Sequence, residues 1–225
     1  MNRQRLEERL GYRFGRPALL AQALTHRSFG TPHNERLEFL GDSVLGFVIA
    51  RELFARFEAQ PEGKLSRIRA TLVREQTLAE LARSIGLGEF LSLGEGELKS
   101  GGAERPSILA DALEAILGAV LLDGGAEEAA RVILALYAAR LEEIDPRQDT
   151  KDPKTRLQEH LQARRINVPA YRVLATRGVA PNEEFEVECR VEALDLVGTG
   201  AGSTRRRAEQ EAARRVYDLL TGAAQ

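Results

Sequence analysis

The chain has 225 residues, 43% of them apolar and 29% charged, a composition typical of a soluble protein that is long for one domain and comfortable for two. It has no run of about 18 apolar residues and no apolar signal segment near its start, so we expect a cytoplasmic protein without membrane association. A single cysteine, Cys189, and three scattered histidines exclude an internal disulfide and a Cys/His zinc site. Any metal must therefore be bound by oxygen ligands.

The charge is divided unevenly along the chain. Residues 151–225 contain 13 Lys and Arg against 11 Asp and Glu, a net charge of +2. Residues 1–150 contain 19 against 23, a net charge of −4. Affinity for a polyanion would therefore depend on local basic patches and not on the charge of the whole protein.

The first elements are helices. The spacing of apolar residues predicts one helix over 3–10 and a second that begins at Pro17. His26 follows the second helix, and a single histidine beside an apolar run is more often structural than catalytic, so we leave it out of the predicted site. A long buried helix is predicted over 34–57.

Acidic side chains share one face of this long helix. At about 100° per residue, Glu35, Glu38 and Asp42 lie within an arc of about 60°. The opposite side carries apolar residues, namely Leu37, Leu40, Val44, Phe47 and Val48. Carboxylates at this spacing repel one another unless a cation offsets the repulsion, and a hard divalent metal ion is the obvious candidate. The alternative is an ordinary solvated acidic face.

Two features of the helix argue against that alternative. Gly41 and Gly46 each cost about 1 kcal/mol relative to alanine inside a helix, so we expect these positions to require the close approach that glycine allows. Phe39 lies about 40° from Glu35, beside the carboxylates and away from the apolar stripe. We therefore expect its ring to need a pocket.

Helical spacing continues after a break at Pro61-Glu62-Gly63. It predicts a helix over 65–87, whose arginines are either surface charges or contacts for an RNA backbone. Residues 94–102 are rich in Gly, Glu, Lys and Ser and predict a flexible loop. Helical residues 126–144 close the first domain.

A second buried helix begins at Pro106, and its residues 108–122 are apolar nearly all round. Its only ionisable residues in that range, Asp111 and Glu114, lie one turn apart on one face. Desolvating an unpaired carboxylate costs roughly several kcal/mol, so each must be paired, protonated or bound to a metal. Facing helices would bring the acids of both together, and such all-oxygen coordination suits Mg²⁺. The four acids are Glu38, Asp42, Asp111 and Glu114.

The stretch Asn34–Asp42, NERLEFLGD, resembles the signature of the ribonuclease III family, the metal-dependent endonucleases of double-stranded RNA. The segment around Asp111 and Glu114 resembles the second acidic motif of that family. The resemblance implies products with 5′-phosphate and 3′-hydroxyl ends, ribosomal RNA precursors and other structured transcripts as substrates, and a homodimer with one site for each strand.

The same resemblance implies a role for each acid. Asp42 and Glu114 match catalytic positions. Glu38, Asp111 and Glu114 match positions that bind Mg²⁺, for which Mn²⁺ can substitute. Glu35 and Glu62 match acids with supporting roles.

The periodicity changes after a charged, proline-containing stretch over 142–150, which predicts a linker. Alternation and helical spacing predict a helix over 155–164, strands over 170–176, 184–192 and 195–200, and a helix over 204–220. The last helix should bury Ala208, Ala212, Val216 and Leu219. The predicted order is α-β-β-β-α.

The last helix is preceded by Gly200-Ala201-Gly202-Ser203 and begins with Arg205, Arg206 and Arg207. Free backbone N–H groups, the helix dipole and guanidinium donors together favour a phosphate site. Arginines at this end of a helix oppose its dipole, so an anion explains them better than helix stability does.

This stretch, with Ser203 included, resembles the closing motif of double-stranded-RNA-binding domains, which read A-form RNA across two minor grooves. Thr155, Gln158 and Glu159 match positions that such domains place in a minor groove. One position departs from the pattern, because Pro181 stands where these domains often have a histidine. Whether that loop contacts RNA is left open.

The sequence thus predicts an all-α nuclease domain over 1–146 followed by an α+β double-stranded-RNA-binding domain over 151–222. The predicted reaction is Mg²⁺-assisted hydrolysis of phosphodiesters in double-stranded RNA. A protein that binds structured RNA without cutting it is the competing class, although it would not need the four acids. A carboxylate-bridged redox centre would need Glu-x-x-His pairs, which the sequence lacks.

Cutting both strands of a duplex requires two sets of acids, and a two-fold symmetric dimer supplies them at a fixed separation. Phe39 is predicted to enter a pocket on the partner, lined by the partner's copy of the NERLEFLGD helix and neighbouring apolar residues.

Overall fold

The computed structural model describes residues 3–145, 152–178 and 183–222, and the protein divides into two compact units, Met1–Gln148 and Asp149–Gln225. Each unit has its own hydrophobic core. No helix in the described ranges is long and apolar enough to cross a membrane. Most of the predicted linker, and Pro181 with its loop, lie outside the described residues.

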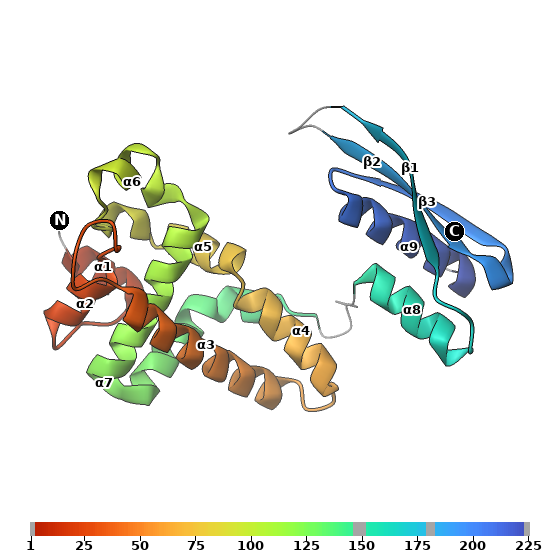
Figure 1. Cartoon of the computed structure of the whole chain (residues 1–225). Coiled ribbons are helices and arrows are strands. Elements are labelled where there is room, and N and C mark those ends of the chain that lie inside the picture. The colour runs from red at the N-terminus through yellow and green to blue at the C-terminus, as the bar shows by residue number, and fades with distance from the viewer. Residues whose placement is uncertain (1–2, 146–151, 179–182, 223–225) are drawn as a thin grey trace. The chain divides into compact units, whose positions relative to one another are not determined.

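The first unit is helical. Its elements are α1 (Arg3–Leu10), α2 (Pro17–Ala23), α3 (Glu35–Arg56), α4 (Glu62–Leu72), α5 (Glu75–Ser84), η1 (Leu87–Phe90), α6 (Glu95–Lys99), η2 (Gly102–Glu104) and α7 (Pro106–Glu142). The long helices α3 and α7 cross at the centre of this unit, and α2 and α5 also pack against α7 (Figure 1). The predicted helix over 34–57 is confirmed.

Glycines allow α3 and α7 to cross with their backbones in contact. A Cβ atom on Gly41 would lie 1.7 Å from the carbonyl oxygen of Glu114, and one on Gly118 would lie 2.2 Å from that of Leu37. The close approach predicted at Gly41 is therefore confirmed. The same prediction is wrong at Gly46 within the described residues of one chain, where no atom outside the helix's own backbone lies within 4 Å of a Cβ position.

The helix α7 changes direction at Gly125, whose φ of +84° lies in the left-handed region that glycine favours. Just before this kink, the Asp123 carboxylate accepts hydrogen bonds from the Tyr12 hydroxyl (2.8 Å) and the backbone N–H groups of Gly15 (2.8 Å) and Arg16 (3.0 Å). Only 3% of its side chain is exposed. Asp123 therefore fastens the loop between α1 and α2 to the kink.

Three predictions for the first unit are wrong. The helix predicted over 65–87 is divided into α4 and α5, because the backbone at Arg74 is extended and the Thr77 hydroxyl donates to the carbonyl oxygen of Thr71 across the break. The loop predicted over 94–102 contains the short helix α6. Phe47 is 61% exposed, because α7 and its neighbours cover a narrower side of α3 than the apolar pattern indicated.

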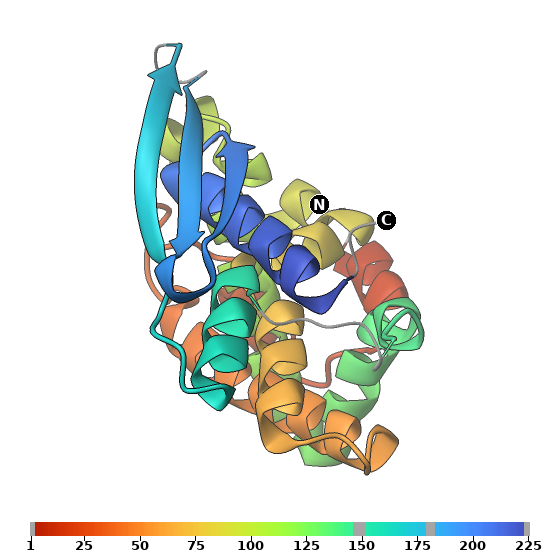
Figure 2. The same ribbon diagram turned by 90° about the vertical axis from the view of Figure 1, so that its right-hand side faces the viewer.

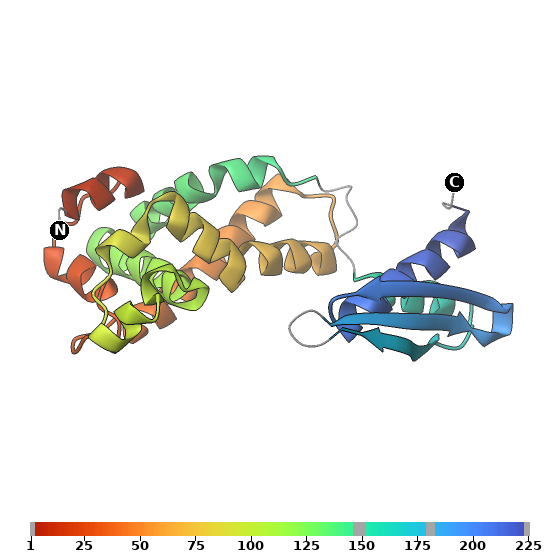
Figure 3. The ribbon, with the colours of Figure 1, turned by 90° about the horizontal axis from the view of Figure 1, so that it is seen from above.

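The second unit is a three-stranded antiparallel sheet with two helices. Its elements are α8 (Pro153–Ala163), β1 (Ala170–Arg177), β2 (Glu184–Val191), η3 (Glu192–Leu194), β3 (Leu196–Gly202) and α9 (Arg205–Thr221), and the strand order is β1-β2-β3. Figures 2 and 3 show that α8 and α9 lie on the same face of the sheet. Leu157, Leu161, Cys189, Val191, Ala212, Ala213 and Val216 form the core between them.

The strand β3 packs closely on α9. A Cβ atom on Gly200 would lie 2.3 Å from the backbone nitrogen of Ala212, and one on Gly202 would lie 2.8 Å from that of Ala208. These glycines, which we interpreted as part of a phosphate site, are therefore required by packing. Leu219, predicted to be inward, is 50% exposed because the buried face of α9 follows Ala208, Ala212 and Val216. The predicted fold class is confirmed.

Candidate active site

Three carboxylates meet where α3 and α7 cross. Glu38 comes from α3, and Asp111 and Glu114 come from consecutive turns of α7. Each offers an oxygen atom, and these atoms all lie within 4.8 Å of one another. All three side chains are half-buried. We call Glu38, Asp111 and Glu114 the acid cluster, and it could hold a metal ion.

Burial and repulsion raise the pKa values of the whole acid cluster. The pKa of Glu114 is raised to about 8, first by burial and then by the nearby charges of Asp42, Glu38 and Asp111. Burial is also the main cause of the raised pKa values of Glu38 and Asp111. The protein therefore supplies too little positive charge here to balance its own carboxylates.

The other predicted acids take different positions. Asp42 is exposed and lies outside the set of three, although its charge acts directly on Glu114. Glu35 is exposed and forms an ion pair with Arg27 at 3.3 Å. Glu62 begins α4 and accepts a hydrogen bond from Ser66 at 2.6 Å. Within the described part of one chain, Glu62 does not join the acid cluster.

A cleft of about 560 Å³ opens beside the acid cluster. Its walls mix acidic groups with cationic and hydroxyl groups, contributed by His26, Arg27, Ser28, Asn34, Glu35, Glu38, Glu97, Arg105, Ser107, Ile108 and Asp111. His26, omitted from the predicted site, lies in this cleft, with its Nδ1 2.8 Å from the hydroxyl of Ser28. The backbone places it there, because the N–H of His26 donates to the carbonyl oxygen of Ser92.

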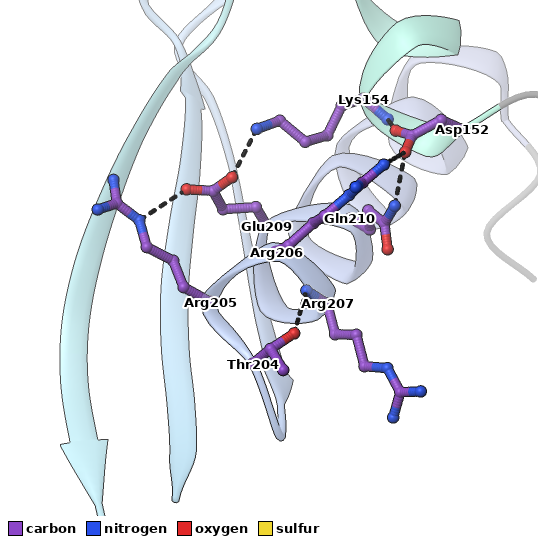
Figure 4. Close-up of polar contacts among 8 residues, drawn as sticks. All are labelled: Asp152, Lys154, Thr204, Arg205, Arg206, Arg207, Glu209 and Gln210. Carbon is purple, nitrogen blue, oxygen red and sulfur yellow. Dashed lines mark hydrogen bonds and ion pairs between the residues drawn. The ribbon is translucent and has the colours of Figure 1, made fainter. Parts of the chain in front are cut away.

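The predicted RNA contacts of the second unit lie on the surface. Thr155, Gln158 and Glu159 are exposed and occupy one side of α8, since they are three and four residues apart. The helix α9 begins after Thr204, whose hydroxyl accepts a hydrogen bond from the backbone N–H of Arg207 (Figure 4). The Ser203 hydroxyl accepts a hydrogen bond from the Arg207 guanidinium at 3.2 Å.

Two of the three arginines already have acidic partners. Arg205 donates through Nε to Glu209 at 2.9 Å, and Arg206 lies 3.8 Å from Asp152 (Figure 4). Asp152 also caps the N-terminus of α8 by accepting from the backbone N–H of Lys154. An external anion is therefore not required to explain why Arg205 and Arg206 stand at this helix end.

Phe39 projects from α3 with 77% of its surface exposed. It borders a groove whose walls are mainly apolar, with Leu19, Leu40 and Leu122, and also include Gln22, Glu35 and Arg36. Phe54 on the same helix is 73% exposed, a feature that the sequence pattern did not predict. Together with the exposed Phe47, these rings give α3 an aromatic side that the described residues of one chain leave uncovered.

Comparison with known proteins identifies the family. Residues 16–141, more than half of the chain, match the family model described as ribonuclease-III-like, and residues 153–220 match the double-stranded RNA binding motif. The chain is 57% identical to "Ribonuclease 3" of Cupriavidus pinatubonensis over 97% of its own length and 85% of the relative's. The chain belongs to the ribonuclease III family.

Solved structures of this family agree with the fold of the first unit. The nuclease domain of ribonuclease III from Campylobacter jejuni is 47% identical, with a TM-score of 0.61, and the match covers 64% of this chain and 99% of that one. A second structure of that domain, 46% identical with the same TM-score, covers 63% and 99%, and its description refers to structural flexibility in a region involved in dimer formation. This ribonuclease III-family chain is thus an endoribonuclease with an RNA-binding unit, as predicted.

Proposed function

We propose that this endoribonuclease hydrolyses phosphodiesters of double-stranded RNA with Mg²⁺ as its cofactor, leaving 5′-phosphate and 3′-hydroxyl ends. The acid cluster carries the proposal, because three half-buried carboxylates from two helices offer ligand atoms within 4.8 Å of one another. The double-stranded RNA binding motif over 153–220 supports the substrate class.

The donor set fits a hard divalent cation. It consists only of carboxylate oxygens, which Mg²⁺ prefers and Mn²⁺ also accepts. Glu38, Asp111 and Glu114 would hold the ion, and Asp42, beside Glu114, would complete the catalytic acids. Bound there, the ion would stabilise negative charge on phosphate oxygens and lower the pKa of a coordinated water.

The residues of the chain itself prepare this site. The glycine contact between α3 and α7 holds the acids of the two helices at a fixed separation. Arg27, paired with Glu35, and Arg105, paired with Glu97, place cationic groups along the same cleft, where they can face a phosphate backbone. We propose supporting roles for Glu35 and Glu62. The position of Glu62 in the described chain does not reach the cluster, so its role would be indirect or would need a second copy.

We propose that the enzyme acts as a homodimer in which α3 contributes the interface. The exposed aromatic side of α3, formed by Phe39, Phe47 and Phe54, supports this proposal. In an isologous interface each ring meets a groove of the other copy, and the groove beside Phe39 is lined mostly by leucines, with Gln22, Glu35 and Arg36 also in its walls. A buried aromatic anchor is often worth about 2 kcal/mol or more. Phe39→Ala should therefore shift a dimer observed by sedimentation at micromolar concentration toward monomer, and an unchanged dimer would contradict the role of this ring.

Ribosomal RNA precursors and other structured transcripts are the proposed physiological substrates, cleaved in the cytoplasm. The combination of a nuclease unit with a motif for double-stranded RNA supports the broader class of double-stranded RNA substrates, and the named transcripts are our proposal within it. Cleavage of messenger and transfer RNA precursors belongs to the same proposal.

The test of the proposed chemistry is Glu114→Gln. It keeps the size of the side chain and removes a ligand charge, so it should abolish Mg²⁺-dependent cleavage of a long RNA duplex while duplex affinity stays within a few-fold. Glu142→Gln is the matched control, because Glu142 lies exposed at the end of the same helix. Cleavage by Glu114→Gln at a near wild-type rate would overturn the site, and end-labelling of the wild-type products would check the 5′-phosphate.

A further inference from the structure

The carboxylate of Glu209 joins α8 to α9. It accepts a hydrogen bond from the Nζ of Lys154 in α8 at 2.5 Å and from the Nε of Arg205 in α9 at 2.9 Å (Figure 4). Only 12% of the Glu209 side chain is exposed. The Lys154 ammonium also lies 4.3 Å from the centre of the Tyr171 ring, so Glu209 and Tyr171 together restrict the position of this ammonium group. Glu209 is therefore a fixed acidic group beneath a cationic surface.

Glu209 remains ionised in this position. Burial raises its pKa, but the hydrogen bonds from Lys154 and Arg205 outweigh burial and hold the pKa below its usual range. If an RNA phosphate displaced the two cations, a nearly buried carboxylate would be left without a partner, which is strongly unfavourable. RNA must therefore bind with the Glu209 contacts in place.

The contact determines which donors of Arg205 remain available. A guanidinium has five N–H donors in a rigid plane, and Glu209 occupies the one on Nε. The terminal nitrogens make no hydrogen bond to any residue in the described ranges, and 64% of the side chain is exposed. Two parallel donors on a plane of fixed orientation match the oxygens of a phosphate.

We propose that Glu209 is a positioning residue for RNA binding, which orients Arg205 and Lys154 so that the terminal nitrogens of Arg205 meet a backbone phosphate. This inference rests on the proposed function, in which the second unit binds double-stranded RNA. Glu209 itself does not touch the RNA. It acts through the two cations that it holds.

A simple electrostatic view predicts the opposite result for the same residue. A carboxylate beneath a phosphate-binding surface repels RNA, so its neutralisation would tighten binding and steepen the dependence on salt. As a positioning residue, Glu209 has the reverse effect, because its loss frees the Arg205 side chain to adopt many orientations. The direction of the change in affinity therefore separates the two explanations.

The experiment measures the dissociation constant of a long RNA duplex over a range of salt concentrations, with chelator present to prevent cleavage. Glu209→Gln should weaken binding about five- to tenfold and lower the salt slope by up to about 0.9, the value for one phosphate contact in B-DNA. Glu211→Gln is the matched control, because it removes the same charge from the same helix, where Glu211 pairs with Arg214 and Arg215. It should leave binding unchanged or slightly tighter.

Two further variants keep the inference falsifiable if Glu209→Gln folds poorly. Arg205→Lys preserves the charge at an exposed position but lacks the Nε–H and the planar fork, so it should weaken binding, although less than Arg205→Ala, which also removes the charge. In an Arg205→Ala background, Glu209→Gln should have little additional effect, because the arginine that it orients is absent. Full additivity of the two changes would overturn the inference.

The outcomes also separate this inference from the proposed function. A wild-type protein that is folded and does not bind duplex RNA would contradict the proposed function itself. Wild-type binding together with a Glu209→Gln variant that binds equally or more tightly would overturn the positioning role alone. Normal binding by Arg205→Lys would do the same.

Discussion

The acid cluster of the first unit and the arginine-rich end of α9 differ in how their charged groups are arranged. In the acid cluster, like charges are packed together at half-buried positions, and the pKa of Glu114 rises to about 8. At α9, two arginines are already paired with Glu209 and Asp152. In the acid cluster the carboxylates raise one another's pKa values, whereas at α9 the cations outnumber their acidic partners, because Lys154 and Arg205 share Glu209 and Arg206 lies beside Asp152. A cation would therefore relieve the repulsion at the first site, whereas an anion can bind at the second without displacing the existing ion pairs.

The largest effect is expected from Gly41→Ala, which should disrupt the crossing of α3 and α7 that positions the acid cluster. The new methyl group would lie 1.7 Å from the backbone carbonyl oxygen of Glu114, so the helices must separate. Overpacking of this kind costs about 1–3 kcal/mol and at times more, which outweighs the gain of about 1 kcal/mol in helix propensity. Cleavage should be abolished and the melting temperature lowered, while the affinity for duplex RNA is retained.

Gly46→Ala provides the control for this substitution in the same helix. Among the described residues, a Cβ atom at position 46 meets no atom of its own chain within 4 Å, so within one chain only the gain in helix propensity remains. Because Gly46 lies two turns from Phe39 on the proposed interface, both variants are compared in a Phe39→Ala background. Thermal unfolding of the two variants gives the comparison. Equal destabilisation by both would show that the contact between α3 and α7 is not what requires glycine at position 41.

The second effect concerns the arginine-rich end of α9. Replacement of Arg205, Arg206 and Arg207 by alanine should weaken duplex binding and flatten its salt dependence. The slope should fall by up to about 0.9 log units for each phosphate that the protein no longer neutralises, on the scale known for B-DNA. Cleavage at saturating RNA should continue, since the acid cluster is untouched. Replacement of Arg214 and Arg215, further along α9, is the control. An unchanged salt slope in the triple variant would remove these arginines from the interface.

The third effect is a dependence of stability on pH. With chelator present, the native state favours protonated Glu114, because its pKa is about 8 against an ordinary value of 4.5. The folded state therefore binds more protons than the unfolded state between these values, and the stability from this group falls as pH rises through that window. The melting temperature of wild type should decline relative to that of Glu114→Gln from pH about 4.5 to about 8.

Addition of Mg²⁺ gives a second comparison between the melting temperatures of wild type and Glu114→Gln. An ion that binds only the native state stabilises it, so Mg²⁺ should restore the melting temperature of wild type at high pH and have a smaller effect on Glu114→Gln. Differential scanning calorimetry over this pH range tests both statements. A wild-type melting temperature that rises with pH in chelator, relative to the variant, would contradict the raised pKa of Glu114.

Periodicity predicted the elements, and the resemblance carried by NERLEFLGD predicted the family. Helical spacing was sufficient to place Glu38 on the acidic face of α3, and to place Asp111 and Glu114 together on one face of α7. The direction of a side chain around a helix depends only on its position along that helix. Helical spacing could not distinguish Gly41 from Gly46, since the difference depends on what lies opposite in space. It also missed the break at Arg74, because apolar residues keep helical spacing on both sides.

Part of the ion-pair network at α9 could not be predicted from sequence patterns, for a related reason. Arg205 and Glu209 are one turn apart and could have been paired from spacing alone. Lys154 and Asp152 come from the other helix, more than 50 residues earlier, and only the packed unit brings them to this end. His26 enters the cleft through a backbone contact with Ser92, for which the sequence carries no local signal.

The Asp123 contacts determine the order in which parts of the first unit can fold while the chain is synthesised on the ribosome. The groups that donate to Asp123 lie 107 to 111 positions earlier in the chain. At a synthesis rate of about 5–20 residues per second, Tyr12 and Gly15 wait roughly 5–20 seconds before their partner has been made. During that interval the loop between α1 and α2 has only local contacts, such as the hydrogen bond from the backbone N–H of Phe14 to Glu7, and its attachment to the rest of the unit comes last.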